Sequence, residues 1–146
     1  MGATGEVLVA LALSVWLITL SAFDIRHRRL PNVLTLPGAA IVLAGAVITG
    51  DGRGATLGAA ALFAAYAAVH LVAPAAMGAG DVKLAIGVGA LTGALGPDVW
   101  ALAALLAAAL TLGWSGVLLA WRSDATVPHG VSMCVSAAVV MWLGLP

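Results

Sequence analysis

The chain has 146 residues, of which 63% are hydrophobic and only 8% are charged, and its mean hydropathy is +1.14. Soluble domains carry roughly 25% charged residues, so the composition excludes an ordinary soluble domain and indicates an integral membrane protein in a lipid bilayer. Six basic and six acidic residues cancel, so no basic surface for binding nucleic acid is expected. The length suits one membrane-embedded domain over residues 1–146.

Six apolar stretches follow one another along the chain, at about residues 7–23, 33–49, 55–73, 82–96, 99–121 and 127–145. Most of them approach the ~20 residues that a membrane-spanning helix needs, and the fourth is short. No Lys or Arg precedes the first stretch, and Glu6 stands where a signal peptide is positively charged. We therefore expect a retained first helix and an all-α, polytopic bundle of about six transmembrane helices.

The basic residues are distributed unequally between the connections of this bundle. If the N-terminus is outside, only Arg53 lies on the outer side, and the other five lie on the opposite side: Arg26, Arg28, Arg29, Lys83 and Arg122. The positive-inside rule makes that side cytoplasmic. The connections at 24–32 and 74–83 then share one membrane face, and each contains an aspartate.

Asp24 ends the first apolar stretch, and Asp81 begins the fourth in "MGAGDVKLAIG". Two carboxyl groups brought close together do not both ionise easily, so one of them keeps its proton. The ionised carboxylate can then take a proton from water, while the protonated carboxyl group donates to a peptide carbonyl. This is the chemistry of aspartic proteases. Taken singly, a solvated cluster around Asp24 and a helix cap at Asp81 are the simpler interpretations.

Small and basic residues surround the second aspartate. Gly78 and Gly80 lack a Cβ, so they allow a sharp turn into the helix and a close approach of a substrate backbone. Lys83 either biases the protonation of the two carboxyl groups or anchors the helix end. The lone Cys134 excludes an internal disulfide and a multi-cysteine zinc site, and no metal or cofactor is implied.

Two motifs in this order resemble the prepilin peptidase, or type IV leader peptidase, family. "MGAGDVKLAIG" resembles the GxGD signature of intramembrane aspartyl proteases, and "DIRHRRLPNVLTLP" resembles the segment that contains the first catalytic aspartate of prepilin peptidases. The matching positions are Asp24, Pro31 and Asn32 in the first motif and Gly78, Gly80, Asp81 and Lys83 in the second. "VPHG" at 127–130 is similar to the family's proline and glycine segment before the last helix, although Val131 stands where a second proline is often found.

The resemblance implies a catalytic pair, Asp24 and Asp81. It also implies removal of the basic leader from prepilins or pseudopilins at the cytoplasmic face of a bacterial inner membrane. Pro31 and Asn32 are expected to end the basic loop and cap the second helix. The chain resembles the short form of the family, associated with Flp pili, without the zinc-binding region that accompanies N-methylation in larger members.

Two other classes of function compete with this interpretation. "GWSG" at 113–116 fits the GxSG of rhomboid serine proteases, with Ser115 as nucleophile and His70 or His129 as base. A packing serine that bonds back to its own helix is the simpler interpretation. A proton-coupled transporter or pilus assembly scaffold is the non-enzymatic alternative, but transport sites usually place ionisable residues near the bilayer midplane. Asp51, Asp98 and Asp124 are expected in loops.

Overall fold

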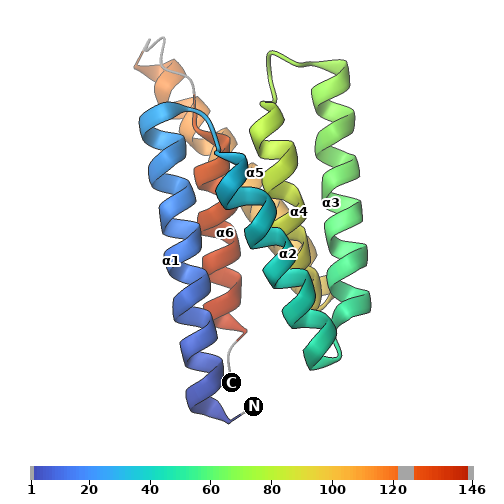
Figure 1. The fold of residues 1–146 in the computed structure, drawn as a ribbon. Coiled ribbons are helices and arrows are strands. Elements are labelled where there is room, and N and C mark those ends of the chain that lie inside the picture. The colour runs from blue at the N-terminus through green and yellow to red at the C-terminus, as the bar shows by residue number, and fades with distance from the viewer. Residues whose placement is uncertain (1, 122–126, 145–146) are drawn as a thin grey trace.

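The computed structural model describes residues 2–121 and 127–144, and every regular element in these ranges is a helix. The six helices are α1 (Ala3–His27), α2 (Asn32–Thr49), α3 (Gly52–Val72), α4 (Ala79–Ala94), α5 (Pro97–Ala120) and α6 (His129–Leu143). They run up and down in one bundle (Figure 1). The expected all-α fold with six helices is confirmed.

Four helices are long and apolar enough to cross a membrane: α1, α2, α3 and α5. The other two are shorter, with 16 residues in α4 and 15 in α6. At 1.5 Å per residue α4 is about 24 Å long, somewhat less than the ~30 Å hydrocarbon core. The chain is a polytopic membrane protein, and its fourth helix is short, as its sequence predicts.

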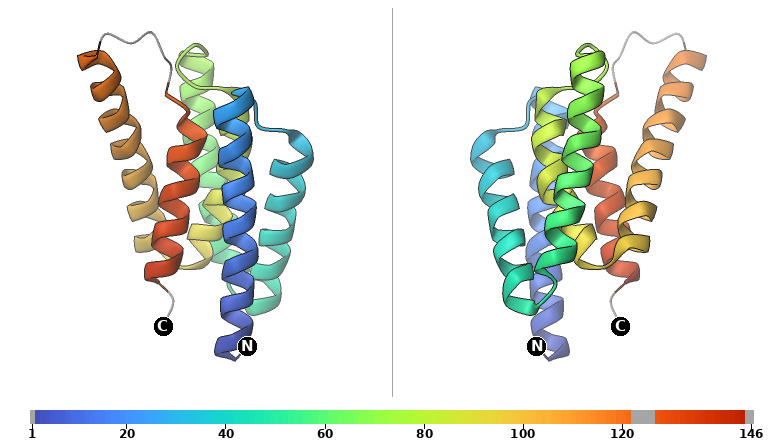
Figure 2. Two further views of the ribbon diagram at one scale, coloured as in Figure 1. Left: turned by 90° about the vertical axis from the view of Figure 1, so that its left-hand side faces the viewer. Right: turned by 90° about the vertical axis from the view of Figure 1, so that its right-hand side faces the viewer.

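Helix α4 forms the centre of the bundle. It packs against α2, α3, α5 and α6, whereas α1 packs mainly against α6. The side views in Figure 2 place α2 and α5 on opposite flanks. Large apolar side chains on the outer helices face outward, as contact with lipid requires, among them Ile48 and Leu119. The central helix α4 is consequently held by four neighbouring helices.

Glycines bring α3 and α4 into backbone contact. A Cβ on Gly54 would lie 2.5 Å from the carbonyl oxygen of Gly93, and a Cβ on Gly89 would lie 2.5 Å from that of Gly58. The four-residue spacing of these glycines places them on one face of each helix. Small residues therefore let α3 lie directly on the central helix.

This contact predicts that Gly58→Ala destabilises the bundle. The new Cβ would overlap the Gly89 carbonyl oxygen and lie 2.8 Å from Gly93 Cα, and such overpacking costs about 1–3 kcal/mol. We expect the thermal midpoint of the protein in detergent to fall by several degrees. Gly45→Ala on α2 is the matched control, because nothing lies within 4 Å of its Cβ. An equal effect of the two substitutions would contradict the contact.

The ends of α1 and α2 differ in detail from the sequence expectation. Helix α1 continues one turn past Asp24, whose backbone carbonyl accepts the Arg28 N–H at 2.9 Å, and Arg28 takes the left-handed conformation (φ 49°) that closes a helix. Of Pro31 and Asn32, which are expected to end the loop and cap α2, only Pro31 occupies the cap position. Pro31 is the N-cap, Asn32 is the first helical residue, and no side chain caps the helix.

Candidate active site

The described parts of three connections lie at one end of the bundle, opposite to the start of α1 and the end of α6 (Figure 1). These parts are residues 28–31 after α1, residues 73–78 after α3, and residues 121, 127 and 128 between α5 and α6. Asp24 is in the last turn of α1 and Asp81 is in the first turn of α4. The topology thus places both aspartates at one end of the bundle, although 56 residues separate them in the sequence.

The Asp24 side chain is buried, with 7% of its surface exposed, and it faces the beginning of α6. The backbone N–H of Val131 donates a hydrogen bond to its Oδ2 at 3.2 Å, and the Gly130 N–H also interacts with the carboxylate. The first N–H groups of a helix have no partner within the helix, and they carry the positive end of its dipole. Burial disfavours a negative charge on Asp24, and the N–H groups at the start of α6 offset part of this cost.

Asp81 lies ahead of the apolar run of α4 and outside the four long spans, and its side chain is half-buried. Burial and the neighbouring charge of Asp24 raise the pKa of the Asp81 carboxyl to about 6, against the effect of a hydrogen bond from the Gly78 backbone. Asp81 consequently binds a proton more readily than an ordinary aspartate does.

Gly130 shows how close the two carboxyl groups are. A Cβ built on this glycine would lie 2.7 Å from Asp24 Oδ2 and 3.2 Å from Asp81 Oδ1. The two oxygens are therefore at most about 6 Å apart, a separation that one hydrogen-bonded water could bridge. A side chain at position 130 would crowd both carboxyl groups, and glycine lets the start of α6 lie directly against them.

The remaining residues of the two motifs connect the loops around the aspartates. Lys83 Nζ donates a hydrogen bond to Asn32 Oδ1 at 2.9 Å, so the start of α4 is tied to the start of α2. A Cβ on Gly80 would lie 3.3 Å from Leu30 Cβ, so this glycine lets α4 pack against the loop before Pro31. Lys83 thus links the starts of α4 and α2, and its expected influence on the protonation of the two aspartates stays a prediction.

The glycines act through their small size rather than through unusual backbone angles. In the described part of the chain the glycines with positive φ are Gly50 and Gly96. Gly78 is the N-cap of α4 with an extended backbone (φ −71°, ψ 144°) that any residue adopts. The turn into α4 therefore does not require a positive φ at Gly78, and the expected close approach of a substrate backbone at Gly78 and Gly80 stays a prediction.

Two of the three histidines near this end of the bundle, His70 and His129, make side-chain hydrogen bonds. His70 Nδ1 lies 2.7 Å from the Met77 carbonyl oxygen, which only accepts, so the ring donates and holds the loop before Gly78. His129, in the "VPHG" segment, lies 2.8 Å from the Tyr66 hydroxyl and 2.7 Å from the Thr111 hydroxyl. Sequence reasoning left the roles of both histidines open.

The residues of the competing interpretations lie apart from the aspartates or have other partners. The Ser115 hydroxyl is exposed and donates to the Thr111 carbonyl of its own helix at 2.8 Å, and neither His70 nor His129 is its partner. Asp51 and Asp98 begin α3 and α5 at the opposite end of the bundle. Asp124 lies outside the described residues.

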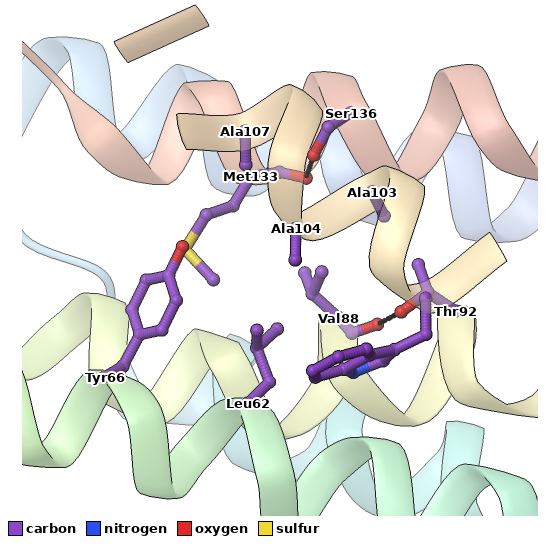
Figure 3. Close-up of a pocket in the computed structure, with 10 residues that line it drawn as sticks. Leu62, Tyr66, Val88, Thr92, Ala103, Ala104, Ala107, Met133 and Ser136 are labelled. Carbon is purple, nitrogen blue, oxygen red and sulfur yellow. Dashed lines mark hydrogen bonds between the residues drawn. The ribbon is translucent and has the colours of Figure 1, made fainter. Parts of the chain in front are cut away.

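Two cavities adjoin the central helix. A small one of about 10 Å³ lies between α3, α4, α5 and α6, where Leu62 and Tyr66 face Ala107 and Met133 (Figure 3). A larger groove of about 400 Å³ lies towards the other end, near Arg53 and Trp100. Neither is lined by an aspartate. Among the described residues, no group of three His, Cys, Asp or Glu side chains lies close enough together to bind a metal ion.

Comparison with known proteins identifies one family. The model of the type IV leader peptidase family matches residues 11–116, which include both aspartates and end before α6. No curated protein and no solved structure matches the chain significantly.

Proposed function

The chain belongs to the type IV leader peptidase family, and we propose that it is an aspartic endopeptidase that removes the basic leader of type IV or Flp-type prepilins or pseudopilins. Family membership supports a protease of the leader peptidase type. The observation that carries the aspartic mechanism is the close approach of Asp24 Oδ2 and Asp81 Oδ1 beside Gly130. A water molecule there would contact both carboxyl groups.

In this mechanism Asp24 is the base and Asp81 is the acid. Backbone N–H groups of α6 favour the ionised form of Asp24. The raised pKa of Asp81 favours its protonated form. Asp24 takes a proton from the bridging water, and the water oxygen attacks the scissile carbonyl carbon. Asp81 gives its proton to the carbonyl oxygen. When the tetrahedral intermediate collapses, the C–N bond breaks, Asp24 passes its proton to the leaving amine nitrogen, and Asp81 takes back the proton from the oxygen.

The location of the site suits a leader that lies just outside the bilayer. Asp24 and Asp81 lie at the end of the bundle that carries Arg28, Arg29 and Lys83, and the positive-inside rule assigns this end to the cytoplasm. We propose a multi-pass protein of a bacterial inner membrane with its N-terminus outside and the aspartates facing the cytoplasm. Cleavage then takes place at the cytoplasmic membrane face.

Co-expression with a Flp-type prepilin tests the proposed function. The host strain lacks its own prepilin peptidase, and the mass of the pilin subunit reports whether the leader has been removed. We expect the mature mass in cells that express the protein and the precursor mass in cells with an empty vector. Precursor alone with several candidate prepilins, in cells that contain inserted protein, would count against the proposal.

The orientation makes a separate prediction. On a Cys134→Ala background, single cysteines replace the exposed residues Arg29 and Ala76 at the site end and Asp51 at the other end. A membrane-impermeant maleimide added to intact spheroplasts should label only the cysteine at position 51, and lysis should expose the other two. Labelling of position 29 or 76 from outside would refute the common cytoplasmic face.

A further inference from the structure

His129 is bound at both of its ring nitrogens by side chains of other helices. Nε2 lies 2.8 Å from the Tyr66 hydroxyl of α3, and Nδ1 lies 2.7 Å from the Thr111 hydroxyl of α5. The rings of Tyr66 and His129 are also in contact, with centroids 5.4 Å apart. Each hydroxyl both donates and accepts, so either neutral tautomer of the imidazole satisfies both bonds.

These two hydrogen bonds join helices that pack on each other only slightly. Helix α3 lies on α4 and α5 lies on α6, with few contacts between α3 and α5 themselves. Figure 3 shows Tyr66 across the small cavity from Ala107 and Met133. The His129 imidazole spans this loosely packed region, and it is itself the first residue of α6. It therefore fixes where α6 begins relative to α3 and α5.

The two residues after His129 contact the aspartates. Asp24 Oδ2 and Asp81 Oδ1 approach each other beside Gly130, and the Val131 N–H donates to Asp24 Oδ2. No flexible link intervenes, because all three residues belong to the first turn of α6. A displacement of His129 would move these backbone groups and with them the Asp24 carboxylate.

We infer that His129 is a positioning residue for the Asp24 and Asp81 carboxyl groups, held for this purpose by Tyr66 and Thr111. The inference rests on the proposed function and assigns a role that the two aspartate motifs do not contain. The imidazole acts through the Gly130 and Val131 backbone rather than on the substrate. Misplacement of reacting groups by ~1 Å costs about 10²-fold in rate, so the loss should appear in kcat.

Substitutions that remove a single hydroxyl test this role in the purified protein. Thr111→Val and Tyr66→Phe each delete one hydrogen bond with little change of shape, and we expect kcat for leader release to fall about tenfold with KM nearly unchanged. Thr111→Ser keeps the hydroxyl and should restore kcat. Ser14→Ala is the matched control, because it removes a hydrogen bond from α6 to α1 made by Trp142 at the other end of the bundle, and its kcat should equal that of the wild type.

Asp81→Asn in the same assay separates the inference from the function on which it rests. If Asp81→Asn is inactive while Thr111→Val keeps the wild-type kcat, the positioning role is refuted and the proposed function stands. If Thr111→Ser loses as much kcat as Thr111→Val, bulk packing rather than the hydrogen bond matters, and the inference is again refuted. Cleavage by Asp81→Asn would overturn the proposed function itself.

Discussion

Asp24→Asn should abolish leader cleavage while the protein still inserts into the membrane. An amide has the shape of the carboxylate but accepts no proton at neutral pH, so the bridging water would have no base. Removing one member of a catalytic unit typically costs about 10⁴-fold or more in kcat. The measurement is the fraction of mature pilin after co-expression, with the amount of inserted protein determined in the same membranes.

The double variant tests whether the two carboxyl groups act as one unit. If they share a single water, Asp24→Asn with Asp81→Asn should be hardly slower than either single variant, because members of a catalytic unit are strongly non-additive. Two independent roles would instead multiply the losses. A double variant several orders of magnitude slower than both singles would therefore contradict the shared water, even if each single variant is impaired.

Gly130→Ala is the second substitution with a large expected effect. The added methyl group would lie 2.7 Å from Asp24 Oδ2 and 3.2 Å from Asp81 Oδ1. The carboxyl groups must then move apart, or α6 must shift away from them. Both outcomes disturb the arrangement of the reacting groups, so we expect kcat to fall by about 10²-fold or more.

The fold should survive this substitution, because alanine favours a helix over glycine by about 1 kcal/mol. Circular dichroism and the thermal midpoint in detergent check this expectation. Gly116→Ala on α5 is the matched control, since nothing lies within 4 Å of its Cβ, and its cleavage rate should equal that of the wild type. A normal rate for Gly130→Ala would mean that the water does not bind between the two carboxyl groups beside Gly130.

The helices were predictable from the sequence because hydropathy alone sets them in a membrane protein. Each apolar stretch became one helix. Two spans, α2 and α3, lie between Asp24 and Asp81, and this even number brings both aspartates to the same end of the bundle. The glycine pairs on α3 and α4 were also visible as four-residue spacings. Helix ends were less predictable, because the charged turn up to His27 continues α1 beyond its apolar run.

The neighbourhood of the aspartates was only partly predictable. The proximity of Asp24 and Asp81 followed from their common end, and their catalytic role stays a prediction. The contribution of Gly130 and Val131 is made through backbone groups, which leave no signature in side-chain chemistry. The partner of Lys83 was also missed, because Asn32 lies 51 residues away in the sequence and resembled a helix cap.

The central claim is that Asp24 and Asp81 activate one water for leader cleavage. It is tested most directly by the initial rate of leader release from a prepilin in liposomes that contain the purified protein and no other peptidase. The rates of Asp81→Asn and Ser115→Ala are compared with that of the wild type. We expect no measurable cleavage by Asp81→Asn and a nearly normal rate for Ser115→Ala. Substantial cleavage by folded Asp81→Asn, or loss of activity confined to Ser115→Ala, would contradict the claim.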